Sequence, residues 1–477
     1  MKGRGLAGKM LKPGSRCYFI GIGGIAMAQA ALLLQEMGYQ VRGSDPALHP
    51  PTDQLLDAGK IVVEEGYAAA HLDPRPDLVV IGNAVSRGNP EVEEVLARGI
   101  PYLSLPALIT EVLLAQRRSA VVAGTHGKTT TASLLAWLLV AGGLDPSFLV
   151  GGVLLNFGRG YRAGAGGWAV LEGDEYDSAF FDKGPKFLHY QPSVAVLTSI
   201  EFDHADIYQD LEAVKNAFRR LIAIIPPEGT LIACSDDAVV REVIAGAQCH
   251  VETYGETGMW SFRGLWATAQ GTIFSLQKGD KKLGELEVPL WGAHNISNVV
   301  AAVAAARRIG LSFAQIREGL LGFQGVRRRM ETVGEAGGIT VIDDFAHHPT
   351  AVRETLRALR SRFPGRRLWA VFEPRSQTMR RRVLQQGLAQ ALAEADRVVL
   401  GRPFSPPAPG EALDPLGVVE EINRHKGDGA ASYLEAVDQI VSHYVAEAIP
   451  GDVIAVMSSG HFEGLPARIF SALKDRA

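Results

Sequence analysis

The chain has 477 residues, of which 47% are hydrophobic and 21% are charged, a composition typical of a globular protein too long for a single core. Its formal net charge of −4 argues against nucleic-acid binding, because contact with a phosphate backbone requires a basic surface. No apolar run reaches the roughly 20 residues of a membrane-spanning helix, and Cys17, Cys234 and Cys249 lack disulfide or metal-ligand spacing, so we expect a cytoplasmic protein that binds neither nucleic acid nor membranes.

A nucleotide-type turn follows the first predicted strand, residues 17–22, after a basic stretch of residues 1–16 that we expect to be a flexible tail. The turn has the pattern G-x-G-x-x-A and precedes a helical pattern over residues 27–37 and a strand over residues 39–43. An acid about twenty residues beyond the first glycine would meet a ribose hydroxyl. The pattern fits a nicotinamide cofactor, and it also fits the pyrophosphate of another nucleotide. The candidate residues are Gly21, Gly23, Gly24, Ile25, Ala26, Ser44 and Asp45.

Further predicted strands near residues 61–63, 77–81 and 100–103 complete a small α/β unit. Asn83 and Ser86 follow the second of these strands, at the sheet edge where open α/β proteins bind ligands. We therefore count both residues among the candidate ligand contacts of this unit.

A second nucleotide-binding motif begins where an apolar strand over residues 120–123 meets a glycine turn and a helical pattern. Such a turn surrounds a phosphate with backbone N–H groups, and the helix dipole favours negative charge there. Lys128 would reach the outer phosphates, and the Thr129 hydroxyl would bind Mg²⁺. Val122 stands where the usual loop has its first glycine, so this turn is a shortened variant. The predicted nucleotide-binding residues are Gly124, Thr125, His126, Gly127, Lys128, Thr129 and Thr130.

Acidic clusters follow two apolar strands downstream of this loop, in residues 172–177 and 201–206. An acid at the end of a neighbouring strand shares in Mg²⁺ binding in such domains, although solvated loop charge is the alternative. Because Mg²⁺ prefers oxygen ligands, Glu172 is the stronger candidate beside Thr129, and His204 is the weaker one.

From the phosphate-binding strand to about residue 325, strands and helices alternate, which predicts a largely parallel sheet. His294 and Asn295 open an alanine-rich helix, either as ligand contacts or as a simple helix cap. The three arginines at residues 327–329 suggest a hinge with phosphate contacts, although a solvated basic face would have the same sequence.

The last segment is again α/β, with predicted strands over residues 339–342, 368–372, 398–400 and 452–457 and no glycine fingerprint. We expect the polar groups after these strands to line a cleft that faces the phosphate-binding domain. Pro349 suits the first turn of a helix. Of the adjacent His347 and His348 we expect at most one to face the cleft, because neighbouring side chains point apart.

In this order the motifs resemble the Mur ligase family, the ATP-dependent amide-forming enzymes of peptidoglycan synthesis, over essentially the whole chain after the tail. The resemblance implies an α/β fold of three domains: a Rossmann-like UDP-sugar-binding domain (17–116), a central P-loop ATPase domain with a mostly parallel sheet (117–326) and a C-terminal Rossmann-like domain for the amine substrate (327–477). The motifs that carry it are the turn at 21–26 with Ser44-Asp45, the loop at 124–131, Glu172, Asp203-His204, His294-Asn295, Arg328-Arg329 and residues 343–349.

Two members of the family are similar to this chain, and both use UDP-N-acetylmuramate. One adds L-alanine; the other attaches the tripeptide L-alanyl-γ-D-glutamyl-meso-diaminopimelate in murein recycling. The segments 81–90, 172–183, 201–206 and 373–376 resemble the tripeptide enzyme, including Tyr176, where the alanine enzyme usually has serine. The turn at 21–26 lacks the usual cysteine and threonine of the tripeptide enzyme and resembles the alanine enzyme.

The resemblance also implies the chemistry: the muramate carboxylate attacks the γ-phosphate of ATP, and the amine then attacks the acyl phosphate. Lys128 would neutralise phosphoryl charge, Thr129, Glu172 and His204 would hold Mg²⁺, and His348 or a cleft carboxylate would accept the proton of the amine. The other implied contacts are ATP with His294, Asn295, Arg328 and Asp344; the UDP-sugar with the glycine turn, Ser44, Asp45, Asn83 and Ser86; and the peptide with His348, Arg375, Ser376 and His461. A monomer or a homodimer is expected.

Two other classes of protein compete with this interpretation. A dinucleotide-dependent oxidoreductase would use the turn at residues 21–26 but would leave the second nucleotide motif unexplained. A binding protein that senses UDP-sugars would share the motifs but would release no phosphate in response to an amine.

Overall fold

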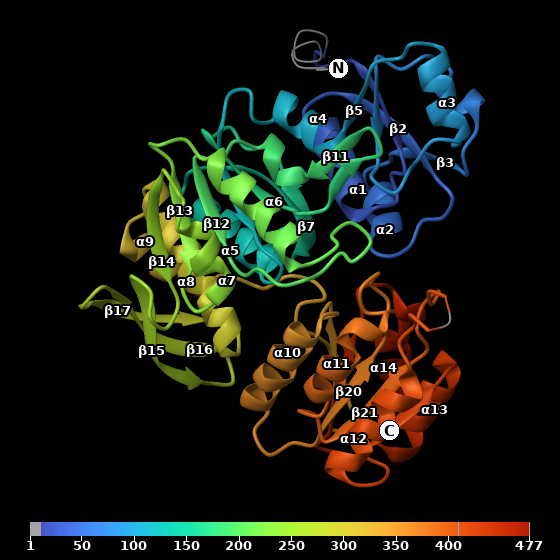
Figure 1. Cartoon of the computed structure of the whole chain (residues 1–477), viewed down its shortest axis with the longest axis vertical. Helices are drawn as coiled ribbons and strands as arrows, with labels where there is room; N and C mark the ends of the chain where they lie inside the picture. The colour runs from blue at the N-terminus through green and yellow to red at the C-terminus, as the bar shows by residue number, and fades with distance from the viewer. Residues whose placement is uncertain (1–10, 409, 477) are drawn as a thin grey trace.

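The structure is a computed structural model that describes residues 11–408 and 410–476, so most of the predicted tail lies outside the described residues. Three α/β domains follow one another along the chain, each around its own main sheet (Figure 1). None of the helices in the described ranges combines the length and the apolar character needed to cross a membrane.

The first domain contains a five-stranded parallel sheet in the order β3-β2-β1-β4-β5. The first strand ends at Ile20, two residues earlier than expected, and the second strand extends to Asp45, so that Ser44 and Asp45 belong to the strand itself. The elements are β1 (Arg16–Ile20), α1 (Ile25–Glu36), β2 (Gln40–Asp45), α2 (Thr52–Ala58), β3 (Val62–Glu65), η1 (Ala69–Leu72), β4 (Leu78–Ile81), α3 (Pro90–Ala97), β5 (Tyr102–Ser104) and α4 (Leu105–Val112).

The second domain is built on a ten-stranded sheet in the order β17-β16-β15-β14-β13-β12-β6-β9-β7-β8. Its centre is parallel, as predicted, with β6 between β9 and β12. The elements up to the sixth helix are β6 (Arg118–Ala123), α5 (Lys128–Ala141), β7 (Ser147–Leu154), β8 (Arg159–Arg162), β9 (Trp168–Gly173), β10 (Asp177–Ala179), β11 (Asp182–Pro185), η2 (Lys186–His189), β12 (Val194–Leu197) and α6 (Leu211–Ala223). The later elements are β13 (Thr230–Cys234), α7 (Ala238–Ile244), β14 (His250–Tyr254), β15 (Trp260–Ala267), β16 (Thr272–Lys278), β17 (Lys281–Val288), α8 (Ala293–Ile309) and α9 (Phe313–Leu321).

Alternating strands and helices did not describe the whole of this domain. Strands β15, β16 and β17 form an antiparallel meander without helices between them, and β8 pairs antiparallel with β7. The β16–β17 connection is a tight turn around Gly279, whose φ of 57° suits glycine. The sheet is therefore largely parallel, as expected, and its antiparallel pairs lie at the two edges.

The third domain contains a six-stranded sheet in the order β18-β19-β23-β20-β21-β22, parallel except for the edge strand β18. Pro349 occupies the first turn of α10, as predicted. The elements are β18 (Glu331–Ala336), β19 (Ile339–Asp344), α10 (Pro349–Arg362), β20 (Leu368–Phe372), η3 (Arg382–Leu384), α11 (Gln385–Leu392), β21 (Arg397–Gly401), α12 (Pro415–Lys426), β22 (Ala431–Leu434), α13 (Val437–Glu447), β23 (Val453–Met457), η4 (Phe462–Gly464) and α14 (Leu465–Arg476).

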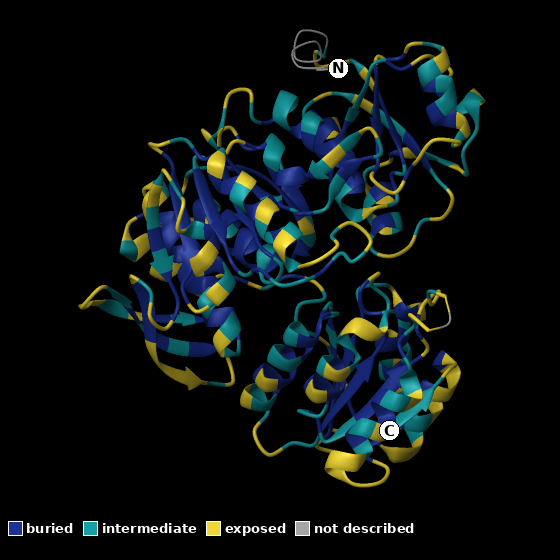
Figure 2. Cartoon of the chain, in the orientation of Figure 1, coloured by how far each residue is buried: buried dark blue, intermediate teal, exposed yellow. Residues whose placement is uncertain are grey.

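The domains differ in how they join. One continuous cluster of buried apolar side chains runs from the first domain into the second, whereas the third domain has two clusters of its own. Figure 2 shows the buried strands as separate dark layers on the two sides of this division. The described contacts between the second and third domains are largely polar, and we therefore expect the third domain to be the one that moves.

Candidate active site

The phosphate-binding turn joins β6 to α5, as the sequence predicted. Gly124 and Gly127 have φ values of 131° and 79°, and a Cβ atom at these positions would lie 2.1 Å from Thr198 Oγ1 and 2.4 Å from Asn298 Oδ1. Both positions thus require glycine on conformational and steric grounds. No side chain caps the start of α5. The turn and the first N–H groups of α5 are consequently available to an anion.

Lys128 lies at this helix start and is almost buried. Its Nζ donates hydrogen bonds to the Gly124 carbonyl oxygen at 2.7 Å and to Glu175 Oε2 at 2.8 Å. Burial alone would lower the pKa of Lys128, but the carboxylates of Glu175, Asp174 and Glu172 outweigh it and raise the pKa. The lysine is therefore charged and positioned beside the turn.

Oxygen atoms of Thr129 and Glu172 meet next to Lys128. Thr129 Oγ1 donates to Glu172 Oε2 at 3.1 Å, and the Gly151 N–H donates to Glu172 Oε1 at 2.7 Å. Burial and the neighbouring Asp174 raise the pKa of Glu172. The carboxylates of Glu172 and Asp174 and the Thr129 hydroxyl form a donor set that suits Mg²⁺, which would relieve the repulsion between the two carboxylates.

His204 reaches this cluster through Glu175, which the sequence analysis did not single out. His204 Nε2 lies 3.2 Å from Glu175 Oε1, so Glu175 connects His204 with Lys128. The backbone of His204 has a φ of 54°, a conformation that non-glycine residues rarely adopt. The sequence alone does not show which of the four acids in residues 172–177 contacts Lys128 and His204. That choice depends on how the chain bends after β9.

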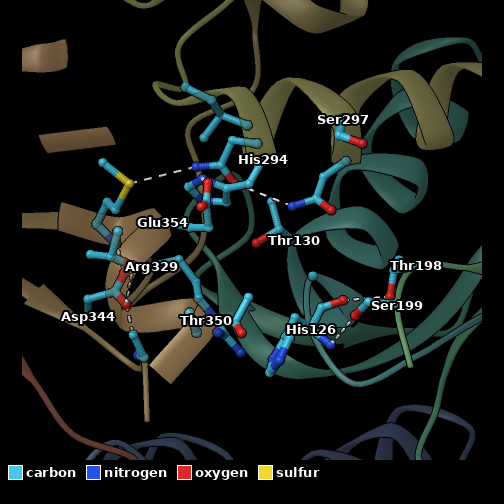
Figure 3. A pocket seen from close by; sticks show the side chains of 18 of the residues that line it. His126, Thr130, Thr198, Ser199, His294, Ser297, Arg329, Asp344, Thr350 and Glu354 are labelled. Atoms are coloured by element: carbon cyan, nitrogen blue, oxygen red, sulfur yellow. Dashed lines mark hydrogen bonds and ion pairs between the residues drawn. The ribbon is translucent and has the colours of Figure 1, made fainter. Parts of the chain in front are cut away.

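A cavity lies between the start of α5, the start of α8 and the loop after β19 (Figure 3). His126, Thr130, His294, Asn295 and Asp344, all predicted nucleotide contacts, line it together. Burial lowers the pKa of His294 to about 4, and its Nδ1 atom has no hydrogen-bond partner among the described residues. Glu354 Oε2, at 3.8 Å, is too far away for a hydrogen bond, and a nitrogen left without one beside a cavity fits a contact to a polar ligand.

Asp344 holds the loop that closes one side of this cavity. Its carboxylate accepts hydrogen bonds from the N–H groups of Met330 and Ala346 at 2.7 and 2.8 Å and from Thr355 Oγ1 at 3.2 Å. Asn295 donates to the Trp291 carbonyl oxygen at 3.0 Å, so it also supports the local backbone.

The arginines at the domain junction point in different directions. Arg328 donates to the carbonyl oxygens of Ser458 and Gly460 at 2.7 and 2.6 Å, inside the third domain. Arg329 instead donates to Thr129 Oγ1 at 3.1 Å and lines the cavity. The structure thus brings Arg329, and not the predicted Arg328, to the nucleotide motif. Three consecutive arginines give no periodic signal that could have distinguished them.

The third domain meets the second at the loop after β12. His348 Nδ1 lies 3.1 Å from Glu201 Oε2, and His347 Nε2 lies 3.8 Å from Asp203 Oδ2. Both histidines therefore face the second domain, and the expectation of at most one is wrong. The rule of alternating directions fails because the pair lies in an irregular loop that ends at the N-cap of α10. Burial lowers the pKa of His348 to about 4.

Of the predicted peptide contacts, two lie in the loop after β20. The Arg375 guanidinium lies 3.3 Å from Glu373 and 3.9 Å from the ring centre of Phe404, while Ser376 Oγ accepts from the Met379 N–H at 3.2 Å. His461 is exposed in the loop after β23.

In the first domain, Asp45 Oδ2 accepts a hydrogen bond from the Gly23 N–H at 2.8 Å and so fixes the glycine turn. Ser44 is buried and donates to Glu91 Oε2 at 2.5 Å, away from solvent. Asn83 and Ser86 are exposed at the carboxyl edge of the sheet. The structure thus places Asp45, Asn83 and Ser86 around the turn, whereas Ser44 supports it from beneath.

Comparison with known proteins matches three family models to successive parts of the chain: the Mur ligase family catalytic domain (residues 16–117), the Mur ligase middle domain (122–306) and the Mur ligase glutamate ligase domain (328–460). An Escherichia coli protein named UDP-N-acetylmuramate–L-alanyl-γ-D-glutamyl-meso-2,6-diaminoheptandioate ligase is 40% identical over 97% of this chain and 99% of its own. A UDP-N-acetylmuramate–L-alanine ligase from Symbiobacterium thermophilum is 36% identical over 97% and 95%. The crystal structure of a murein peptide ligase from Psychrobacter arcticus matches with a TM-score of 0.74 and 36% identity over 97% of this chain and 99% of that one.

Proposed function

The chain belongs to the Mur ligase family of ATP-dependent ligases, and from that premise we propose that it joins UDP-N-acetylmuramate to the tripeptide L-alanyl-γ-D-glutamyl-meso-diaminopimelate. The bond formed is an amide between the lactyl carboxylate of the sugar and the amine of the peptide, with ADP and phosphate as the other products. The single observation that carries the choice of substrate is the 40% identity to the E. coli tripeptide ligase across nearly the whole of both chains.

The geometry of the phosphate-binding turn supports the ATP-dependent step. A carboxylate is a poor electrophile, and its phosphorylation supplies a leaving group of low basicity. Lys128 and the uncapped start of α5 are placed to neutralise the phosphoryl group during transfer. Thr129 and Glu172, with His204 and Glu175 behind them, would hold Mg²⁺, which when bound screens the phosphate charges.

We assign the cavity of His294, Asn295 and Asp344 to the nucleoside part of ATP, and Arg329 rather than Arg328 to a phosphate. The glycine turn of the first domain, Asp45, Asn83 and Ser86 would bind the UDP-sugar, with Ser44 in a supporting role. Arg375, Ser376 and His461 would bind peptide groups of the incoming amine substrate.

His348 is our candidate acceptor for the proton of the attacking amine. Its imidazole is nearly buried, and its pKa of about 4 keeps it neutral at physiological pH, as an acceptor must be. Glu201, 3.1 Å from its Nδ1, could stabilise the imidazolium that forms.

We also infer a cytoplasmic location, where ATP and UDP-sugars are available, and a monomer or homodimer.

The decisive experiment offers the protein UDP-N-acetylmuramate and Mg-ATP with either the tripeptide or L-alanine, and measures product mass and phosphate release. The proposal expects the tripeptide adduct and one phosphate per adduct. A product formed only with L-alanine would assign the chain to the other family activity. Phosphate release without either amine adduct, or a spectral response to NAD(P)H, would contradict the ligase assignment.

A further inference from the structure

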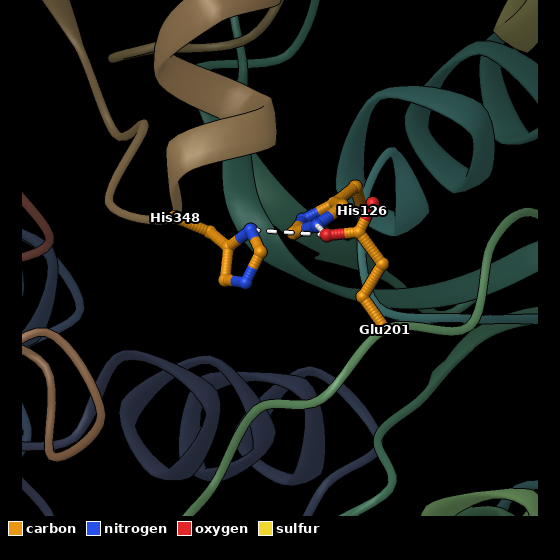
Figure 4. A group of neighbouring side chains, drawn as sticks. All are labelled: His126, Glu201 and His348. Atoms are coloured by element: carbon orange, nitrogen blue, oxygen red, sulfur yellow. Dashed lines mark hydrogen bonds and ion pairs between the residues drawn. The ribbon is translucent and has the colours of Figure 1, made fainter. Parts of the chain in front are cut away.

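Two nitrogen donors and a carboxylate meet where the third domain touches the phosphate-binding turn (Figure 4). His126 belongs to the turn, Glu201 to the loop after β12, and His348 to the N-cap of α10. His126 Nε2 lies 3.2 Å and His348 Nδ1 lies 3.1 Å from the same atom, Glu201 Oε2. Three atoms that could bind a metal therefore lie close together, although they come from segments more than 70 residues apart in the sequence.

The spacing of these atoms suits a small tetrahedral cation. Bonds of about 2.0–2.1 Å at tetrahedral angles separate neighbouring donor atoms by about 3.3–3.4 Å. The two nitrogen–oxygen distances are close to this value, and all three donor atoms lie within 4.8 Å of one another.

The hydrogen bonds around the cluster also leave room for a cation. The Thr350 N–H points at His348 Nδ1 at 3.4 Å, as an N-cap contact, which requires a lone pair on that nitrogen. The same nitrogen faces Glu201 Oε2, another lone-pair atom. A cation between Nδ1 and Oε2 would relieve the repulsion between these two atoms, and because an imidazole nitrogen has one lone pair, it would replace the long Thr350 contact. Meanwhile Thr350 Oγ1 donates to Glu201 at 2.9 and 3.0 Å and orients the carboxylate.

We propose that His126, Glu201 and His348 form a binding site for a divalent transition metal of the zinc class. Two imidazoles and one carboxylate, with a fourth position open, are a ligand set that favours Zn²⁺ over Mg²⁺. The site differs in chemistry from the cluster of Thr129, Glu172 and Glu175, where oxygen donors predominate and His204 is the nitrogen donor. A bound cation would tie the third domain to the phosphate-binding turn and hold this arrangement of the domains.

The consequence for the protein is a cation-dependent restraint on domain movement. His348 is the only one of the three ligands from the third domain, so the metal bond forms only when the domains are together. Zinc should therefore raise the thermal stability of the whole chain and slow any step that needs the domains to part. Binding itself can be measured without substrates, so the proposal does not depend on the proposed ligase reaction.

The test is a titration of the metal-free full-length protein with Co²⁺ in excess Mg²⁺, followed by visible absorption and then by displacement with Zn²⁺. Excess Mg²⁺ occupies the oxygen site, and tetrahedral Co²⁺ with nitrogen ligands reports the other. We expect one equivalent of Co²⁺ with a tetrahedral spectrum that Zn²⁺ abolishes. Glu201→Gln and His348→Gln should each weaken binding about tenfold or more.

The matched control is His204→Gln, which makes the same substitution at a histidine of the neighbouring acidic cluster and should leave the Co²⁺ spectrum and affinity unchanged. The melting temperature of each metal-free variant verifies that it is folded, and His126→Asn replaces either test variant that is not. The proposal is overturned if no stoichiometric tetrahedral site forms. It is equally overturned if Glu201→Gln and His348→Gln bind Co²⁺ as the unmodified chain does, or if His204→Gln abolishes the spectrum.

Discussion

Lys128 Nζ and Glu175 Oε2 are 2.8 Å apart, so the lysine expected to meet the γ-phosphate is paired with a buried carboxylate in this structure. Only 3% of the Glu175 side chain is exposed. The pair therefore keeps Lys128 charged and oriented until a phosphate can replace the carboxylate. The same carboxylate contacts His204. Nucleotide binding at Lys128 would therefore also change the electrostatic environment of the His204 imidazole.

We expect Lys128→Ala to lower turnover by about 100-fold or more, because it removes a charge whose contact strengthens as the phosphoryl group is transferred. The variant also leaves Glu175 buried without its partner, so it should be less stable than the unmodified chain. Lys128→Ala with Glu175→Gln should recover stability but not activity. Phosphate release and urea unfolding measure the two effects, and near-normal turnover of either variant would disprove the role of the lysine.

Glu172→Gln should raise the Mg²⁺ concentration needed for half-maximal activity by about 10- to 100-fold. The carboxylate is placed between Thr129 and the Gly151 N–H, where it can provide a charged ligand, and the amide keeps the shape but not the charge. A titration of activity with Mg²⁺ at saturating ATP measures the shift. Asp145→Asn, in a half-buried ion pair with Arg162, is the control and should leave the Mg²⁺ dependence unchanged.

The arginines at the domain junction allow a three-way comparison. Arg329→Met should raise the KM for ATP by about tenfold or more, since its guanidinium contacts Thr129 and lines the cavity. Arg328→Met should instead destabilise the third domain, because its bonds to Ser458 and Gly460 hold the loop after β23. Arg327→Met removes an exposed side chain and should change neither. Equal effects of the three on KM would contradict the assignment.

Much of the site could be predicted because short local patterns dictate it. Gly124 and Gly127 are required by their backbone conformation, and Lys128 and Thr129 follow them at fixed spacing. Pro349 likewise begins α10 where expected. These features depend on neighbours in the chain, and a single sequence contains that information.

The parts that escaped prediction depend on distant contacts. Arg329 and Arg328 are indistinguishable until the loop after β23 is placed beside one of them. Glu175 gains its role only when Lys128 and His204 converge on it. Both members of the His347–His348 pair face the second domain because two separate acids, Asp203 and Glu201, approach from the loop after β12.

Stability should fall as the pH is lowered from 6.5 towards 4, partly through His294. Burial lowers its pKa from 6.5 to about 4, so between these values the unfolded chain binds the proton more strongly than the folded chain. The free energy of unfolding therefore rises with pH across this window and is independent of this group above it. The side chain is 29% exposed, so we expect a contribution of about 1–2 kcal/mol at pH 5.

Urea unfolding at pH 7 and pH 5 tests this contribution. His294→Gln should reduce the loss of stability between the two pH values, because the amide does not titrate. His425→Gln replaces a histidine that is 65% exposed and should leave the loss unchanged. The same pH sensitivity in all three proteins would show that His294 is not a source of it.

The contact between Thr378 and Asp203 provides the last prediction, which concerns domain closure. Thr378 Oγ1 donates to Asp203 Oδ1 at 2.6 Å and accepts from the Ala205 N–H at 3.3 Å. It thereby joins the loop of Arg375 and Ser376 to the loop of His204. Thr378→Val keeps the shape of the side chain but removes both hydrogen bonds, and we expect kcat to fall about tenfold, because a closed site excludes water from the acyl phosphate.

Small-angle scattering separates this explanation from a local effect. With an ATP analogue and the UDP-sugar together, the unmodified chain should become more compact than without ligands, and Thr378→Val should compact less. Thr350→Val is the companion variant, since Thr350 bonds Glu201 across the same boundary at 2.9 Å and should act in the same direction. Scattering profiles of the unmodified chain that do not change with ligands would contradict a closing cycle. A drop in turnover with full compaction would place the effect of Thr378 in the peptide-binding loop itself.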